Sequence, residues 1–80
     1  APMPTIARIG PYRVFFYAGD RSEAVHVHVE REHKVAKFWL DPARLARSGG
    51  FSPKEIGRIQ ALLRKHEARL IEAWNDYFRS

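Results

Sequence analysis

The sequence predicts an α+β fold in which a small antiparallel sheet of three to four strands is followed by one long C-terminal helix. Residues 4–41 hold short β-prone runs separated by turn residues. Residues 53–78 repeat apolar side chains at helical spacing. A chain of 80 residues is long enough for a single domain, residues 1–80, with a thin core.

Four strands are expected before residue 42. Residues 5–9 (TIARI) are β-prone, and residues 12–17 (YRVFFY) are aromatic and β-branched. Residues 18–23 (AGDRSE) are expected to form a polar loop. Residues 25–30 alternate valine with polar side chains, as a half-buried strand does, and residues 34–40 (KVAKFWL) form the fourth strand.

The last two strands are predicted to pair as a hairpin around a two-residue turn, Glu32-His33. Cross-strand partners then have residue numbers that sum to 65, and one face of the hairpin is wholly apolar. A slip of one residue would mix the two faces, which supports this register. The apolar pairs are Val29 with Ala36, Val27 with Phe38 and Val25 with Leu40; the opposite face pairs His28 with Lys37 and His26 with Trp39.

A short helical turn is predicted after the sheet, over residues 42–47 (PARLAR). Asp41 would cap it, and Pro42 suits the first helical position. Gly49-Gly50 would end it.

The long helix is predicted to begin after Ser52, whose hydroxyl accepts from the third backbone N–H while Glu55 reaches back. A helix from there to about Phe78 is nearly 40 Å long at ~1.5 Å per residue, more than a four-stranded sheet covers. Its end (EAWNDYF) is therefore expected to project and to pack on a second copy or another protein. A break near His66 would remove that need. The expected core comprises Val14, Phe16, Val25, Val27, Val29, Phe38, Leu40, Ile59, Leu63 and Leu70.

Composition excludes several classes of protein. There is no cysteine, so disulfide and thiol chemistry are excluded. No apolar run approaches the ~20 residues of a membrane span, and the N-terminus lacks the pattern of a signal peptide. We therefore expect a cytoplasmic protein without membrane association.

Positive charge is concentrated in the second half of the chain, which carries most of the net charge of +5. A basic cluster of this kind attracts phosphate or an acidic protein surface. A solvated face of a basic protein is the alternative. Between residues 42 and 65 the only acid is Glu55, and the cations are Arg44, Arg47, Lys54, Arg58, Arg64 and Lys65.

His26, His28 and Glu30 share one face of their strand because strand side chains alternate. Two imidazoles and a carboxylate are ligands for a divalent metal. Neighbours two apart are, however, ~6.5–7 Å apart along a strand, which is wide for joint coordination. We therefore expect neither a metal nor another cofactor.

The same face is a candidate site for acid–base chemistry. A like charge on Lys37 would lower the pKa of His28, and a neutral imidazole could take a proton from a ribose 2′-hydroxyl while lysine steadies the phosphate. This hypothesis is a metal-independent ribonuclease; the alternative is a wet sheet face that docks a partner. The candidate catalytic residues are His26, His28 and Lys37, and the candidate RNA- or phosphate-binding residues are Arg44, Arg47, Lys54, Arg58 and Trp39.

The segments MPTIARIGPYRVFFYAGD, HVHVE, AKFWLDPARLARSGGFS and EAWNDYF together resemble the bacterial domain-of-unknown-function family 4160, from Met3 to Phe78. The family usually has two prolines just before its HVHV-type histidine, where this chain has Ala24 and Val25. The resemblance implies a small α+β protein encoded beside a second small protein, an arrangement that suggests a toxin–antitoxin pair.

These observations lead to two hypotheses for function. In the first, the protein is the toxin-like component of such a pair, acts on RNA or translation and binds a small antitoxin-like partner. In the second, it is a non-catalytic module that binds an acidic protein or nucleic acid. Self-association through the C-terminal helix is compatible with both.

Overall fold

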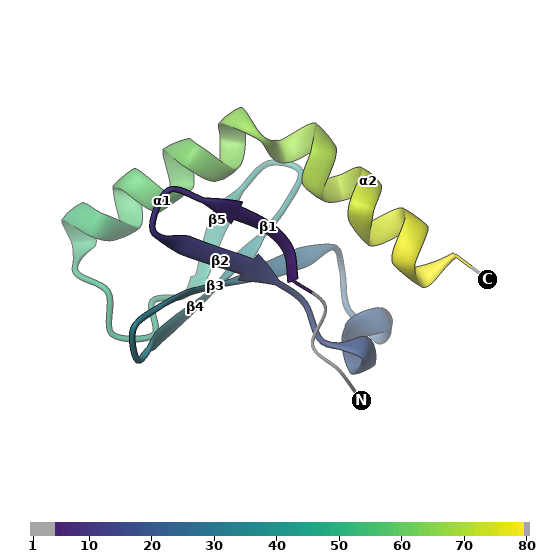
Figure 1. Cartoon of the computed structure of the whole chain (residues 1–80), viewed down its shortest axis with the longest axis horizontal. Coiled ribbons are helices and arrows are strands. Elements are labelled where there is room, and N and C mark those ends of the chain that lie inside the picture. The colour runs from purple at the N-terminus through teal and green to yellow at the C-terminus, as the bar shows by residue number, and fades with distance from the viewer. Residues whose placement is uncertain (1–4, 80) are drawn as a thin grey trace.

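The structure, a computed structural model, describes residues 5–79 and has an α+β fold. One antiparallel sheet has the strand order β1-β2-β3-β4-β5, so each strand pairs with its neighbour in sequence. Figure 1 shows α1 and α2 crossing one side of the sheet, and η1 near the sheet end that lies below the C-terminus of α2. The elements are β1 (Thr5–Ile9), β2 (Tyr12–Phe15), the 3₁₀ helix η1 (Ala18–Ser22), β3 (His26–Arg31), β4 (Lys34–Trp39), β5 (Arg44–Arg47), α1 (Pro53–Lys65) and α2 (Glu67–Phe78).

The hairpin of β3 and β4 confirms the predicted register. The residue numbers of every pair sum to 65, from His26 opposite Trp39 to Arg31 opposite Lys34. The turn has two residues, and Glu32 adopts φ 58° there, the left-handed conformation that tight hairpin turns require. Alternation along β3 therefore places the valines on one face of the sheet and the histidines on the other, as expected.

The helical turn predicted for residues 42–47 is wrong, because Arg44–Arg47 form a fifth strand that pairs with β4. Asp41 turns the chain with φ 67° instead of capping a helix. Ala43 is then fixed from both sides. Its N–H donates to Glu67 Oε1 at 2.7 Å, and its carbonyl accepts from Arg64 Nε at 3.1 Å. The strands thus extend beyond the predicted range of residues 4–41, of which Pro4 lies outside the described residues.

The predicted single helix is divided at His66, which adopts φ −110° and ψ 13° between α1 and α2. The break lets α2 bend over the sheet, so that Leu70 and Trp74 are buried within the chain. The expectation that this end projects away from the sheet is therefore wrong. The alternative, a break near His66, is confirmed.

The start of α1 is capped as predicted by Ser52, whose Oγ accepts from Glu55 N–H at 3.2 Å. The Glu55 carboxylate does not reach back to the cap as predicted. Its Oε2 accepts from the Tyr12 hydroxyl and from Arg31 Nη1, both at 2.8 Å. Glu55 therefore ties the first turn of α1 to β2 and β3.

The main core lies between the valine face of the sheet and the two helices. All but one of the predicted core residues are buried; Val25 is half-buried. Phe16 is buried elsewhere, in an aromatic cluster with Trp74, Tyr77 and Phe78 from α2. The side chains at the centre of the main core are Val14, Val27, Val29, Ala36, Phe38, Ile59 and Leu63.

Gly49 lies against the backbone of β4 and has φ 59°. A Cβ there would lie 1.8 Å from the Val35 carbonyl oxygen, so the backbone would have to move. We expect Gly49→Ala to lower the free energy of unfolding by at least about 2 kcal/mol. The matched control is Gly57→Ala, because Gly57 lies inside α1 with no neighbour within 4 Å of its added Cβ. It should raise stability by about 0.5–1 kcal/mol. Urea unfolding measures both, and equal effects would contradict this account.

Glu55 should make the protein sensitive to acid. The hydrogen bond from Tyr12, and then that from Arg31, hold the pKa of Glu55 below its ordinary value of 4.5 despite partial desolvation. A carboxyl with a lowered folded-state pKa stabilises the fold above 4.5, and this contribution is lost as pH falls through the folded value. The difference in unfolding free energy between wild type and Glu55→Gln should therefore shrink on acidification below 4.5. If the unfolding free energies of wild type and Glu55→Gln changed with pH in parallel, the pair between Glu55 and Arg31 would add no pH-dependent stability.

Candidate functional site

His26 and His28 point to the same face of the sheet, as predicted, but that face is not wet. Their exposed fractions are 0% and 6%. The chain that follows β2 returns over them as η1, and Trp74 of α2 contacts His26 with ring centroids 5.1 Å apart. The expectation of an open histidine face is therefore wrong. The reason is that residues 18–22, expected as a loop, form a 3₁₀ helix that packs on this face.

Asp20 of η1 brings the two histidines together. Its Oδ2 lies 3.1 Å from Nε2 of His26 and 3.1 Å from Nε2 of His28. The same oxygen accepts the backbone N–H of Tyr17 at 2.8 Å, which fixes the carboxylate at the start of η1. The side chain of Asp20 is only 12% exposed. A buried triad of two imidazoles and one carboxylate results.

The two imidazoles use this carboxylate differently. Nε2 of His28 hydrogen-bonds Asp20 Oδ2. Nδ1 of His26 lies 2.8 Å from the Ala24 carbonyl oxygen, which only accepts, so Nδ1 carries the proton. Nε2 of a neutral His26 then has a lone pair. It is buried, faces Asp20, and has no hydrogen-bond partner in the described part of the chain.

Burial and charge shift the pKa values of the triad. Burial lowers the pKa of His28, and this outweighs its contacts with Asp20; the like charges of His26 and Lys37 lower it further. The lowering predicted from Lys37 thus has the right sign, with burial as its main cause. For Asp20, burial raises the pKa, but the N–H of Tyr17 and the two imidazoles together bring it below its ordinary value. At neutral pH Asp20 is therefore ionised and the His28 ring is neutral.

Aromatic rings enclose the triad. The His28 ring stacks on Phe15 at 5.3 Å and meets Tyr17 edge-on at 4.7 Å. His26 lies between Trp39, at 5.7 Å, and Trp74. This wall lowers the local dielectric, which strengthens the attraction between the Asp20 carboxylate and any cation beside it.

The remaining predicted members of this face are engaged elsewhere. Lys37 lies across from His28, as predicted, but its Nζ pairs with Glu23 at 2.5 Å and lies 4.6 Å from the Trp39 ring centroid. Glu30 pairs with Arg13 Nη1 at 2.6 Å, away from the two imidazoles. Asp20 therefore takes the place of Glu30 beside the histidines.

The predicted phosphate-binding cations lie on two adjacent elements, well apart from the triad in sequence. Arg44 and Arg47 belong to β5, and Lys54 and Arg58 to α1; all four are exposed. β5 leaves the junction of the helices at Ala43 and runs toward the start of α1, so the two elements lie antiparallel and in contact. We call this the β5–α1 basic surface.

Sequence reasoning missed Asp20. It lies in a polar segment without periodicity, so no pattern ties it to His26. A weak signal was present, since Asp20 is the acid that follows Gly19 in a short connection between two strands. Such acids commonly bind a nearby backbone N–H. The contact with the histidines depends on the path of the connection, which only the fold shows.

Fold and site define a small α+β protein with a five-stranded antiparallel sheet, two C-terminal helices and a buried His–His–Asp triad. The family profile described as "Domain of unknown function (DUF4160)" matches residues 12–75, and the chain belongs to that family. No curated protein and no solved structure matches the chain. In the described part of the chain, neither helix has the length and apolarity that crossing a membrane requires.

Asp20→Ala should destabilise the fold more than the loss of a surface acid does. The substitution leaves the Tyr17 N–H and His28 Nε2 without their shared acceptor, which costs about 1–3 kcal/mol. Glu23→Ala is the control, because Glu23 is exposed and loses only its pair with Lys37. Chemical denaturation compares the two variants. If both lose the same stability, Asp20 does not organise this face.

Proposed function

We propose that this protein binds RNA through the β5–α1 basic surface and acts as the toxin-like component of a toxin–antitoxin pair. The observation that carries the proposal is the unneutralised charge of that surface. The resemblance to family 4160 supports the setting, a small protein that works with a small partner. The exposure and the charge of the surface support the binding role.

The cations of the basic surface have no acidic counterpart. Within residues 5–79, no ion pair involves the cations of β5 or the exposed ones of α1. The nearby acids are occupied, since Glu55 is bound by Tyr12 and Arg31, and Glu67 by the N–H of Ala43. An uncompensated row of cations attracts a polyanion and releases its counterions on binding. The cations concerned are Arg44, Arg47, Lys54, Arg58 and Lys65.

The form of the surface suits a nucleic-acid backbone. β5 is an edge strand whose four side chains are all exposed, and Leu45 among them is 42% exposed. Arg44 and Arg47 lie opposite Trp39 and Lys37 on one side of the sheet, whereas Leu45, opposite Phe38, points to the other side. The two arginines therefore share a side of the edge strand, where phosphates would contact them.

Binding, rather than cleavage, is the activity that this geometry favours. A general base must come within about 2.6–3.2 Å of the ribose hydroxyl that it deprotonates. His26 is fully buried beside Trp39 and Trp74, and His28 is only 6% exposed, so neither ring can approach a ribose hydroxyl. Lys37 is already paired with Glu23. The ribonuclease hypothesis would require η1 to leave the histidines.

An acidic protein is the second candidate for the same surface, since carboxylates could replace phosphates there. Contact through the end of the C-terminal helix has less support. Trp74 and Phe78 pack on Phe16 of the same chain, and Tyr77 is the one large side chain of that cluster left exposed, at 43%. The basic surface is therefore the better place to test for a partner.

Salt-dependent binding to single-stranded RNA tests the proposal. We expect affinity to fall steeply with salt, because each bound phosphate releases counterions. The double variant Arg44→Gln/Arg47→Gln should bind more weakly, with a salt slope smaller by about 1 for each phosphate that the missing arginines would have bound. Arg8→Gln is the matched control, because Arg8 is exposed on β1 at the opposite edge of the sheet. Fluorescence anisotropy measures all three proteins.

Four outcomes would contradict the proposal. RNA binding could be absent at low salt, or Arg8→Gln could weaken it as much as the double variant does. Binding to polyglutamate without binding to RNA would favour the acidic partner. Cleavage of the RNA by wild type and not by His26→Ala would restore the catalytic hypothesis.

A further inference from the structure

We propose that Asp20, His26 and His28 form a binding site for a divalent transition-metal ion of the zinc class. The site goes beyond the proposed function, because its three ligands come from η1 and β3 and none belongs to the β5–α1 basic surface. It also departs from the expectation that the chain holds no metal. That expectation considered Glu30 as the carboxylate, whereas the fold supplies Asp20.

Two of the three distances between donor atoms already suit a metal's ligands. Zinc binds imidazole nitrogen and carboxylate oxygen at about 2.0–2.1 Å, and at tetrahedral angles neighbouring donors are then ~3.3 Å apart. Asp20 Oδ2 lies 3.1 Å from Nε2 of each histidine. One ligand atom from each of the three residues lies within 4.8 Å of the other two. Small side-chain adjustments would place an ion among them.

The orphaned Nε2 of His26 is the second observation that points to an ion. It is fully buried, lacks a hydrogen bond in the described residues, and faces a carboxylate that has no proton to give. With His26 neutral, the lone pairs of its Nε2 and of Asp20 Oδ2, 3.1 Å apart, repel each other unless a cation, either a metal ion or a proton on Nε2, lies between them. A bound metal ion accepts both lone pairs.

The surroundings of His26 match the usual support of a metal ligand. Its Nδ1–H donates to the Ala24 carbonyl, which fixes the ring and leaves Nε2 for the ion. The N–H of Tyr17 holds the Asp20 carboxylate in the same way. His28 would bind through Nε2 after that nitrogen gives up its proton, with Nδ1 keeping one.

The ligand set selects the class of ion. Two imidazoles and one carboxylate suit zinc, cobalt or nickel, while magnesium and calcium prefer oxygen ligands throughout. The three ligands come from η1 and β3, so the ion would fasten the 3₁₀ helix to the sheet. Its role would be structural, since aromatic rings leave little access to the triad.

Metal binding by untagged protein, freed of metal with a chelator, tests the inference. We expect one Zn²⁺ per chain by elemental analysis after gel filtration, a melting temperature that rises with Zn²⁺ concentration, and visible d–d absorption when Co²⁺ replaces zinc. Asp20→Asn and His28→Gln should each weaken Zn²⁺ binding at least about tenfold. Circular dichroism establishes that each variant is folded.

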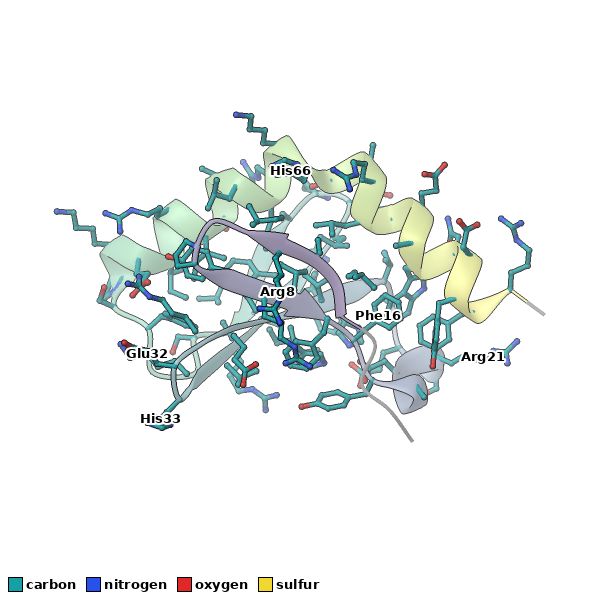
Figure 2. All side chains as sticks on the ribbon, viewed as in Figure 1. Arg8, Phe16, Arg21, Glu32, His33 and His66 are labelled. Carbon is teal, nitrogen blue, oxygen red and sulfur yellow. The ribbon has the colours of Figure 1, made fainter. Side chains whose placement is uncertain are left out.

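The double variant His33→Gln/His66→Gln is the matched control, because it removes the same number of imidazoles outside the triad. Figure 2 shows His33 at the hairpin tip and His66 at the helix junction, each far from Phe16. This variant should bind Zn²⁺ as wild type does. Absence of stoichiometric Zn²⁺, binding that survives both triad substitutions, or loss of binding in the control would overturn the inference. Should both triad variants fail to fold, the stoichiometry and Co²⁺ spectrum of the folded control decide it.

Discussion

The strict alternation along β3 is the constraint on which the rest of this structure depends. Because successive side chains of a strand face opposite sides, Val27 and Val29 enter one interior while His26 and His28 enter another. Two helices fill the first interior. The second is closed by η1 and by aromatic rings, with an ionised carboxylate at its centre. A domain of this size thus buries both faces of β3 from His26 to Val29.

The parts of the fold that follow from local pattern could be predicted. The register of β3 and β4 was predictable because any slip of one residue would place a histidine among the valines. The capping role of Ser52 was predictable because Ser52 precedes a proline and a run with helical periodicity. The strand at residues 44–47 could not be predicted, since RLAR contains good helix formers and its sequence favours a helical turn. The segment becomes a strand because Ala43 is held by its hydrogen bonds with Glu67 and Arg64. The break at His66 carries no glycine or proline; burial of α2 against the sheet decides it.

The site was predictable in its histidines and unpredictable in its setting. Alternation alone showed that His26 and His28 share a face, but whether solvent or protein covers a sheet face depends on how the connections run. Asp20 reaches the histidines because η1 folds back over β3. Asp20 is six residues from His26 and eight from His28, and no helix or strand periodicity predicts a contact at these separations. The same covering explains why a face that resembles an acid–base site in the sequence lies enclosed in the fold.

The placement of the tryptophans has a consequence for how the molecule can be observed. The chain has two, Trp39 on β4 and Trp74 on α2, and their ring centroids lie 5.7 and 5.1 Å from that of His26. Indole emission therefore originates from one neighbourhood, which also borders the basic edge strand, because Trp39 lies opposite Arg44 of β5. The two indoles are in effect a built-in optical probe of the buried His–His–Asp triad, so changes there can be followed without attaching a dye.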